Sequence, residues 1–428
     1  MEPRFQERKA RLLADCQVPP RTFRGAVCRL ETFAQPFIAS LPSPESQQHT
    51  RTYLAGLLSD VEHKSAEAIA YRHDLDRQTL QHYIGSSPWD HKPPIDELNR
   101  QVAAALGAPN AVLVFDPSAF PKKGTASVGV QRQWCGRLGK LENCQVGVFL
   151  GYVTDIEHAL VDFRLYLPAE WAKDRTRRRR CGVPKEIRSR TRHERALEML
   201  ERRGPMLPHG WVSGDDEMGR PAWFRRKLAA RHERYLWAVP SNTSIRDLEV
   251  EPPPSCGRGR RPKAPFQGVR AWCETRPAAA WTRLTVRDGE KGPLEVEIVA
   301  RRVESKLGRR VVGFEELLVA VRYEEGGKLK YDYHLSNAAA MTPPAELARV
   351  AKAEHRIEEC LKRSKSEAGL GDDQVRNWFG WHHHMALSLI ATWFLVGEAG
   401  RGKKGGSGAD SAAGASRVGA DLSQGVPV

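Results

Sequence analysis

The sequence predicts an α/β protein in which a mixed sheet with helices on its faces follows a helical N-terminal region. Three β-rich segments in succession begin near residue 111, and the order helix, strand, helix, strand then continues to about residue 240. Such an order is typical of a mixed sheet packed between helices. With 428 residues, 40% of them hydrophobic, the chain is long enough for two or three domains with buried cores.

Residues 1–108 are expected to form a helical domain. A short helix, SAEAIAYR, is followed by a brief turn, and Asp76 can then cap a further helix, DRQTLQHYI. Two short helices around a tight turn are typical of a DNA-binding helix-turn-helix, whose second helix would expose Arg77, Gln78, Gln81 and His82. The alternative is a helical packing domain with a solvated polar face.

Residues 109–240 are predicted to form the first part of the mixed sheet. AVLVFD, at 111–116, is an apolar run that ends in a carboxylate, and CQVGVFLGYV and HALVDFRLYL follow it as β-rich segments. A helix at about 192–203, a strand that ends at Asp215, a helix at about 221–231 and the strand YLWAVP complete this part.

The remaining chain divides into three predicted parts. Residues 241–338 contain two hairpin-like patterns, RLTVRDGEKGPLEVEIVA and LLVAVRYEEGGKLKYDYHLSN, which indicate a β-rich insertion. Helices from Pro344 to about Ala368 and from Trp378 to Leu395 are predicted for the next part, 339–396, and would pack against the mixed sheet. The Gly/Ser/Ala-rich segment 397–428 is expected to be disordered.

Charge and sequence bias indicate the partner and the compartment. A net charge of +15 favours a polyanionic partner, most simply nucleic acid. The cysteines are scattered without the spacing of a structural zinc site. The charged N-terminus has no apolar core for export, and the longest apolar run is too short to cross a bilayer, so we expect a cytoplasmic protein with no membrane contact.

Two basic segments are candidates for DNA contact. The stretch from Lys173 to Arg192 holds ten basic and two acidic residues, and it precedes the strand that ends at Asp215. Its densest part is Arg177, Arg178, Arg179 and Arg180. The alternative is a charged face that only water contacts. Lys122 and Lys123 follow Asp116 closely, and the FPKKG segment should turn beside it.

Three acidic residues could form a metal site. Asp116 and Asp215 end apolar strand patterns, and strand ends in an open sheet converge on a crevice. With Glu358, on the helix after the insertion, they could hold two Mg²⁺ or Mn²⁺ ions about 3.5 to 4 Å apart for phosphodiester cleavage. Lys362 and Lys365 share a helix face with Glu358 and could reach the phosphate backbone. The alternative reading of this spacing is an exposed Glu–Lys pair that only supports the helix.

Several segments in this order resemble one family, the bacterial insertion-sequence transposases with an RNase H-like DDE endonuclease domain. They are SAFPKKG, SVGVQRQWCGRLGKLENCQVGV, DFRLYLPAEWAKD, GDDEMG, RIEECLKRSKSEAGL and WFGWHHH. The resemblance covers roughly residues 30 to 395. It implies that the catalytic, metal-binding residues are Asp116, Asp215 rather than Asp216, and Glu358 rather than Glu359. It also implies that the insertion interrupts the catalytic domain and that Lys365 contacts DNA near the active site.

The activity that the resemblance implies is DNA transposition. Such a protein would bind the terminal inverted repeats of its element, cut them with two metal ions and join the freed 3′-OH to target DNA. It would act as a homodimer on paired ends, on the nucleoid of a bacterial cell.

This sequence departs from its relatives at three positions. Ala351 and Glu354 stand where relatives often have Tyr and Arg, and Met218 stands where an aromatic residue is common. These departures motivate an alternative, a catalytically weak or inactive transposase-derived DNA-binding regulator or targeting factor. A related nuclease without strand transfer is a third possibility.

Trp378, Trp381 and three consecutive histidines, 382–384, form the last aromatic cluster. Consecutive helical residues point in different directions, so the histidines cannot all bind one ion. We expect the tryptophans to pack in the core and a histidine to be exposed or to face DNA.

Overall fold

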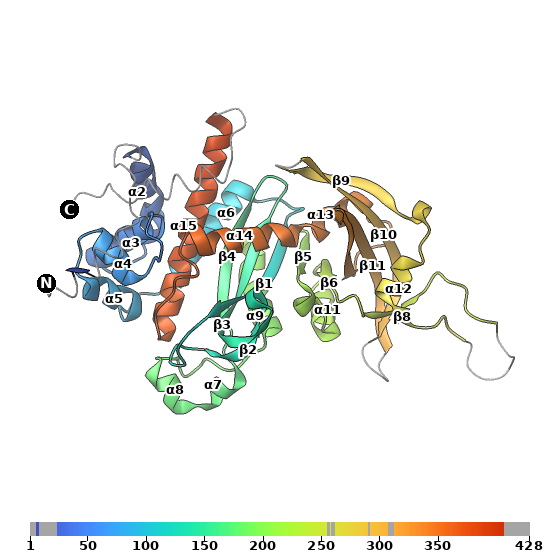
Figure 1. Ribbon diagram of the computed structural model, residues 1–428, viewed down its shortest axis with the longest axis horizontal. Helices are drawn as coiled ribbons and strands as arrows, with labels where there is room; N and C mark the ends of the chain where they lie inside the picture. The colour runs from blue at the N-terminus through green and yellow to red at the C-terminus, as the bar shows by residue number, and fades with distance from the viewer. Residues whose placement is uncertain are drawn as a thin grey trace.

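One mixed sheet forms the centre of the molecule, with helices from both ends of the chain packed against it (Figure 1). The computed structural model describes residues 6–7, 24–254, 257, 262–289, 292–306 and 312–405. Within them the sheet has twelve strands in the order β2-β3-β1-β5-β6-β12-β11-β10-β7-β8, with β4 beside β3 and β9 beside β10. The predicted α/β fold class is therefore confirmed.

The first half of the sheet has an RNase H-like arrangement. Its strands are β1 (Val112–Pro121), β2 (Gln131–Cys135), β3 (Lys140–Val153), β4 (His158–Leu165), β5 (Trp211–Gly214) and β6 (Tyr235–Ala238). β3 is antiparallel to β1 and to β4, whereas β5 is parallel to both β1 and β6. The observed order β4-β3-β1-β5-β6 brings together strands that are far apart in the sequence.

The prediction that the first strand ends at Asp116 is wrong. β1 continues to Pro121 because it stays paired with β3 as far as Pro121↔Cys144. Its pairing with β5 does stop earlier, at Phe115↔Gly214. Beyond that point β1 has a ladder partner on one side only, which is where a strand tolerates proline. Asp116 is thus the first residue past the parallel pairing.

The β-rich segment predicted over 241–338 extends this sheet. Its strands are β7 (Ser244–Asp247), β8 (Gln267–Gly268), β9 (Thr282–Gly289), β10 (Gly292–Lys306), β11 (Val312–Glu325) and β12 (Lys328–Ser336). Both predicted hairpins are present, as β9–β10 and β11–β12. β12 also pairs antiparallel with β6 from His334↔Ala238 to Ser336↔Leu236, so the sheet continues from its RNase H-like half into the insertion. A separate small core, which includes Trp272, stabilises the insertion.

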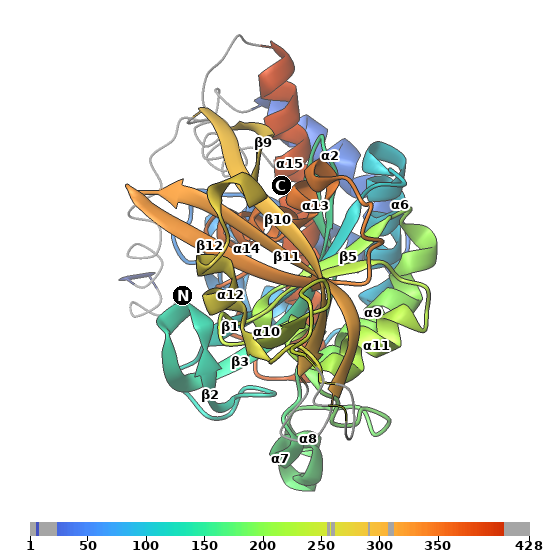
Figure 2. The ribbon, with the colours of Figure 1, turned by 90° about the vertical axis from the view of Figure 1, so that its right-hand side faces the viewer.

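Helices from the N-terminal and C-terminal parts of the chain, and from between the strands, pack around this sheet (Figures 1 and 2). Those before it are α2 (Arg24–Ile38), α3 (Pro44–Leu57), α4 (Ala66–Arg72), α5 (Arg77–Gly85) and α6 (Lys92–Leu106). Those within the sheet region are α7 (Ala169–Lys173), α8 (Arg175–Arg180), α9 (Arg192–Arg203), α10 (Asp216–Gly219), α11 (Ala222–Ala229) and α12 (Val269–Glu274). Those that follow the insertion are α13 (Pro344–Ala351), α14 (Ala353–Glu367) and α15 (Trp378–Gly405). In the described residues, no helix is long and apolar enough to span a membrane.

Two predictions for the C-terminal helices need correction. The single helix expected over 344–368 is divided at Lys352 into α13 and α14. α15 continues to Gly405, past the expected start of the disordered tail at 397. The Glu398 carboxylate accepts hydrogen bonds from Nε of Arg29 on α2 at 2.9 and 3.0 Å, which holds this extension against the N-terminal helices. The rest of the predicted tail lies outside the described residues.

The three consecutive histidines lie where α15 packs against the N-terminal helices. His382, His383 and His384 are all buried, so the expectation of an exposed or DNA-facing histidine is wrong. The ring of His383 stacks on Trp89, with 3.8 Å between the ring centroids, and Nδ1 of His384 lies 2.9 Å from the Tyr53 hydroxyl on α3. α15 therefore fixes the position of the N-terminal helices.

Lys64 lies at the same junction and should make stability depend on pH. Its Nζ donates to the backbone carbonyl of Glu367 at 2.6 Å, and burial lowers the pKa of Lys64 from 10.5 to about 8. Between these values the unfolded chain binds more protons than the folded one. The free energy of unfolding should therefore rise with pH across this window, by on the order of 2 kcal/mol.

Urea denaturation at pH 7.5 and 10.5 would measure this effect. The rise should be larger in the wild type than in Lys64→Met, which has no titrating group at this position. Equal pH dependence in the two proteins would show that Lys64 is not responsible.

Candidate active site

Asp116 and Asp215 each come directly after the point where the parallel pairing of β1 and β5 ends, so the two residues lie side by side. The β1–β5 pairing ends at Phe115↔Gly214, so the next residue on each strand is one of the two aspartates. Gly214 permits this close approach, because a Cβ there would lie 2.4 Å from the Phe115 carbonyl oxygen. The Asp215 carboxylate also caps α10, where it accepts a hydrogen bond from the Met218 backbone N–H at 2.8 Å.

The surroundings of both aspartates disfavour negative charge. Burial, followed by the charges of Asp215 and Glu358, raises the pKa of Asp116 to about 8. Burial raises the pKa of Asp215 to about 7, although the Met218 N–H opposes the shift. Both residues keep some solvent contact, as groups that meet a substrate must. The surroundings therefore favour the protonated carboxyls, although the charges of Lys365 and Arg192 oppose the shifts at Asp116 and Asp215, respectively.

α14 places Glu358 near enough to Asp116 for its charge to act there. This helix packs across β1, β3, β4 and β5 (Figure 1). Gly151 on β3 lets it approach closely, since a Cβ there would lie 2.2 Å from Cδ1 of Ile357. Glu358 follows Ile357, and its 58% exposed side chain lies 3.4 Å from Nδ1 of His355. Its charge helps to raise the pKa of Asp116, so it acts on the same site.

The contact between Gly151 and Ile357 gives a test of how α14 is placed. Gly151→Ala should force the helix away from β3, destabilise the protein by about 1–3 kcal/mol and reduce any cleavage, because Glu358 moves with the helix. Adding Ile357→Val should recover part of both losses. Thermal unfolding and a cleavage assay would measure them. The matched control is Gly268→Ala, at a position where nothing lies within 4 Å of the added Cβ. A loss no greater than that of the control would contradict the prediction.

A fourth carboxylate, Glu354, belongs to the same cluster. It lies one helical turn before Glu358, and burial, followed by the charges of Asp215, Glu358 and Asp116, raises its pKa well above the usual range. The sequence shows Glu354 only as a departure from the arginine of relatives. Its four-residue spacing from Glu358 was the available signal, since residues four apart share a helix face.

The donor set suits a hard divalent cation. In the described part of the chain, no three Asp, Glu, His or Cys side chains are already close enough together to hold an ion. Asp116, Asp215 and Glu358 nevertheless offer only carboxylate oxygens, the ligands that Mg²⁺ and Mn²⁺ prefer. A divalent cation would offset the burial and the carboxylate repulsion that together raise the pKa of Asp116. Glu358 is exposed enough to turn from His355 toward the aspartates.

Comparison with known proteins agrees with this geometry. Residues 36–293, more than half of the chain, match the family model of the DDE superfamily endonucleases. The chain belongs to this family. The matched region contains both aspartates and ends before Glu358. A probable transposase for insertion sequence element IS701 from Microchaete diplosiphon is 30% identical over 156 residues, which are 36% of this chain and 40% of that protein. The match thus spans less than half of the relative's length.

In this DDE endonuclease, Lys365 lies directly at the carboxylates. Its Nζ donates a hydrogen bond to Oγ of Ser118 on β1 at 2.6 Å. Burial lowers the pKa of Lys365, and the charge of Asp116 opposes that shift. Lys362, three residues earlier on α14, is exposed. The structure therefore places Lys365 at the site and Lys362 on the solvent side of the helix.

Lys122 and Lys123, predicted together, have different surroundings. Lys122 is 12% exposed, and its Nζ lies 3.3 Å from the carboxylate of Asp373, which is almost fully buried. Lys122 therefore holds the segment before α15 and is not a free DNA contact. Lys123 is exposed.

The four consecutive arginines also differ in their surroundings: two make contacts within the protein and two are exposed. α7 and α8 project from the sheet at the lower edge of Figures 1 and 2. Arg177 stacks on Trp171 at 3.9 Å, and Arg178 donates to the Pro184 carbonyl at 2.7 Å, so both stabilise the projection. Arg179 and Arg180 are exposed and are available for a phosphate backbone.

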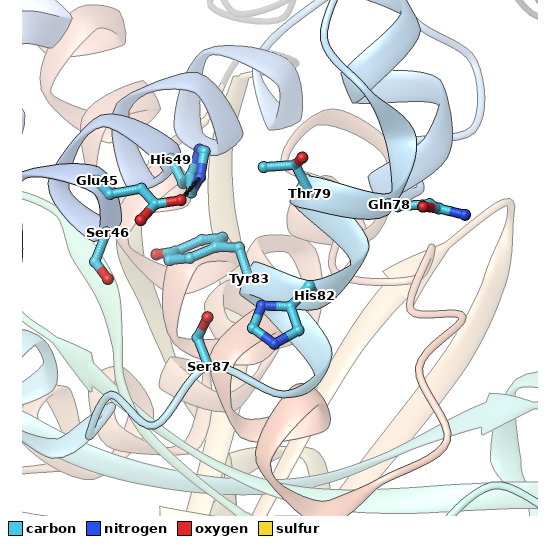
Figure 3. Close-up of a pocket in the computed structure, with 8 residues that line it drawn as sticks. All are labelled: Glu45, Ser46, His49, Gln78, Thr79, His82, Tyr83 and Ser87. Carbon is cyan, nitrogen blue, oxygen red and sulfur yellow. Dashed lines mark ion pairs between the residues drawn. The ribbon is translucent and has the colours of Figure 1, made fainter. Parts of the chain in front are cut away.

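The predicted pair of short helices is present in the N-terminal domain. α4 and α5 are separated by a four-residue turn, and the Asp76 carboxylate accepts a hydrogen bond from the Gln78 N–H at 2.5 Å. Gln78, Gln81 and His82 are exposed, whereas Arg77 is half-buried. α3 and α5 line a hollow of about 360 Å³, and Gln78 points away from its central Tyr83 (Figure 3).

Proposed function

We propose that this protein is an insertion-sequence transposase. It binds the terminal inverted repeats of its element, cuts the DNA at the carboxylate site and joins the freed 3′-OH to target DNA. The observation that carries the proposal is the side-by-side placement of Asp116 and Asp215 beneath the helix that bears Glu358. The family match and the name of the relative support it.

The carboxylates would hold two divalent ions, Mg²⁺ or Mn²⁺, with Asp116, Asp215 and Glu358 as ligands. When bound, such ions polarise the scissile phosphate and activate the attacking water or hydroxyl. Ser118 keeps the Lys365 ammonium beside Asp116, where it can bind a phosphate oxygen. The N-cap bond to Met218 fixes the orientation of the Asp215 carboxylate before DNA arrives.

DNA contacts would come from three regions. Lys123, Arg179, Arg180 and Lys362 are exposed cations on the catalytic domain, suited to the phosphate backbone. α5 would enter the major groove with Gln78 and its neighbour Arg77. Because two ends must be held together, the protein would act as a homodimer on paired ends, on nucleoid DNA in the bacterial cytoplasm.

The test is cleavage of duplexes that carry the inverted repeats flanking the gene of this chain. With Mg²⁺ or Mn²⁺ the protein should release a 3′-OH end and join it to a second duplex, and light scattering should show two chains on paired ends. Cleavage without joining would indicate a nuclease that lacks strand transfer. Binding without cleavage would overturn the proposal in favour of the second candidate.

The second candidate is a transposase-derived DNA-binding regulator or targeting factor that cuts weakly or not at all. Glu354 favours it, because a carboxylate in place of the arginine of relatives adds negative charge next to the DNA path. Met218 does not favour it: this side chain is completely buried, so its change from an aromatic residue alters core packing. Ala351 is buried as well.

A further inference from the structure

A second feature adjoins Asp215, a hollow of about 590 Å³ between β2 and α10. Its size lies in the usual range of ligand pockets, about 300–1,000 Å³. The side chains that line it include Trp134, Pro117, Arg192, Asp215, Glu217 and Arg220. One wall is therefore a flat indole with apolar neighbours, and the other carries hydrogen-bonding groups.

Trp134 is presented to solvent at this wall. Its side chain is 53% exposed although it belongs to a regular strand. Its cross-strand partner is Leu141 on β3, which is 57% exposed. Leu138, in the turn between β2 and β3, is 44% exposed. These residues form an apolar surface next to the carboxylates, and the exposed cations Arg132 and Arg137 flank it.

The wall that carries Trp134 is held rigidly. Arg192 forms an ion pair with Glu217, and its Nη2 lies 3.5 Å from Oε1 of Gln133, the residue before Trp134. Cys135, the residue after it, is completely buried. The indole therefore sits between two anchored neighbours, and the Arg192–Glu217 pair joins its strand to the turn that follows Asp215.

The hairpin formed by β2 and β3 also faces Lys365. Its turn packs against β1, and the charge of Arg137 contributes to lowering the pKa of Lys365. The apolar surface and the carboxylate site thus lie on the same face of the molecule. A DNA strand at the carboxylates would pass the hairpin.

We infer that this hollow takes one unpaired nucleobase of the bound DNA, stacked on Trp134. A paired base within a duplex cannot offer its face to a side chain, whereas an extruded base can. Aromatic stacking accepts any base, and Glu217 and Arg220 lie where they could bond to polar base edges. The inference rests on the proposed function in so far as DNA is the substrate. It predicts that DNA is locally unpaired next to the cut.

The experiment measures binding without cleavage. The full chain, with Ca²⁺ in place of Mg²⁺, is titrated with a fluorescein-labelled duplex that has one unpaired adenine near its end, and with the fully paired duplex. The wild type should bind the unpaired duplex about tenfold more tightly, as expected for one stacked base. Trp134→Ala should lose this preference, and Trp134→Phe should keep most of it.

A fluorescence measurement with a matched control variant locates the base. With 2-aminopurine at the unpaired position, the wild type should quench the fluorescence and Trp134→Ala should leave it bright. The matched control is Trp223→Ala: Trp223 is 41% exposed on α11 and is not among the residues that line this hollow. This variant should behave as the wild type does.

Three results would overturn the inference: no preference in the wild type, an unchanged preference in Trp134→Ala, or a Trp134→Ala variant that alters only self-association in solution. The last would assign the apolar surface to an interface between copies. Failure of this inference about the unpaired base can be told apart from failure of the proposed function. A wild type that never cuts terminal repeats but shows the Trp134-dependent preference refutes only the transposase proposal. One that cuts, with a preference independent of Trp134, refutes only this inference.

Discussion

Asparagine in place of Asp116 or Asp215 should abolish cleavage and, in the same variant, raise thermal stability in the absence of metal. Each substitution removes a ligand charge, which should reduce the cleavage rate by on the order of 10³-fold or more. Without metal, each also removes a charge that its surroundings disfavour, since burial and neighbouring carboxylates raise the pKa of both residues. The variants should therefore melt at or above the wild-type temperature.

Added Mn²⁺ separates this explanation from general damage to the protein. The wild type should gain thermal stability with Mn²⁺, and both asparagine variants should gain much less. Glu358→Gln should also lose cleavage, but its melting temperature without metal should hardly change because Glu358 is exposed.

Asp216→Asn is the matched control for these variants. Asp216 is exposed and lies 3.8 Å from Arg220, so its replacement should leave both cleavage and the Mn²⁺ effect intact. Retained cleavage in Asp116→Asn or Asp215→Asn, or its loss in Asp216→Asn, would contradict the assignment of the site.

The local patterns of the sequence predicted most elements because each pattern reports its own segment. The α9 bounds, both insertion hairpins and the strand before Asp215 agree with the structure. The length of β1 could not be predicted, since its second half is a strand only through pairing with β3, over twenty residues away. The continuity of the sheet from β6 to β12 depends on a contact between residues about a hundred positions apart.

The roles of single side chains were predicted least well, because a sequence shows charge but not its partners. Lys122 and Arg178 read as DNA contacts, yet they bind Asp373 and the Pro184 carbonyl. Glu354 joins the carboxylates only because α14 lies across the sheet. The sequence patterns assigned no role to Trp134, and only the structure shows that it is exposed beside Asp215.

Glu316→Ala should be the most destabilising single change in the insertion. Glu316 on β11 is completely buried, and its oxygens accept hydrogen bonds from Arg225 on α11 at 2.8 and 3.0 Å. The Tyr235 hydroxyl on β6 donates to the same carboxylate at 2.8 Å. Alanine would leave the buried Arg225 guanidinium without a counter-charge, which should reduce the free energy of unfolding by about 3–5 kcal/mol.

Urea denaturation would measure this loss against two matched variants. Glu315→Ala removes the neighbouring pair with Arg302, which is about half exposed on both sides, and should change stability by less than about 1 kcal/mol. The double change Arg225→Met with Glu316→Leu removes both charges and should recover much of the loss. If Glu316→Ala is no worse than Glu315→Ala, the buried pair does not stabilise the fold.

The same pair should also affect catalysis, which distinguishes it from an ordinary stabilising contact. Nη1 of Arg225 donates at 2.5 Å to the carbonyl of Gly219, the last residue of the short helix that Asp215 caps. The insertion therefore supports, through Glu316 and Arg225, the turn that orients the Asp215 carboxylate. At a temperature where Glu316→Ala remains folded, cleavage should fall while binding of the uncut duplex persists. An unchanged cleavage rate would show that the insertion stabilises the sheet without positioning Asp215.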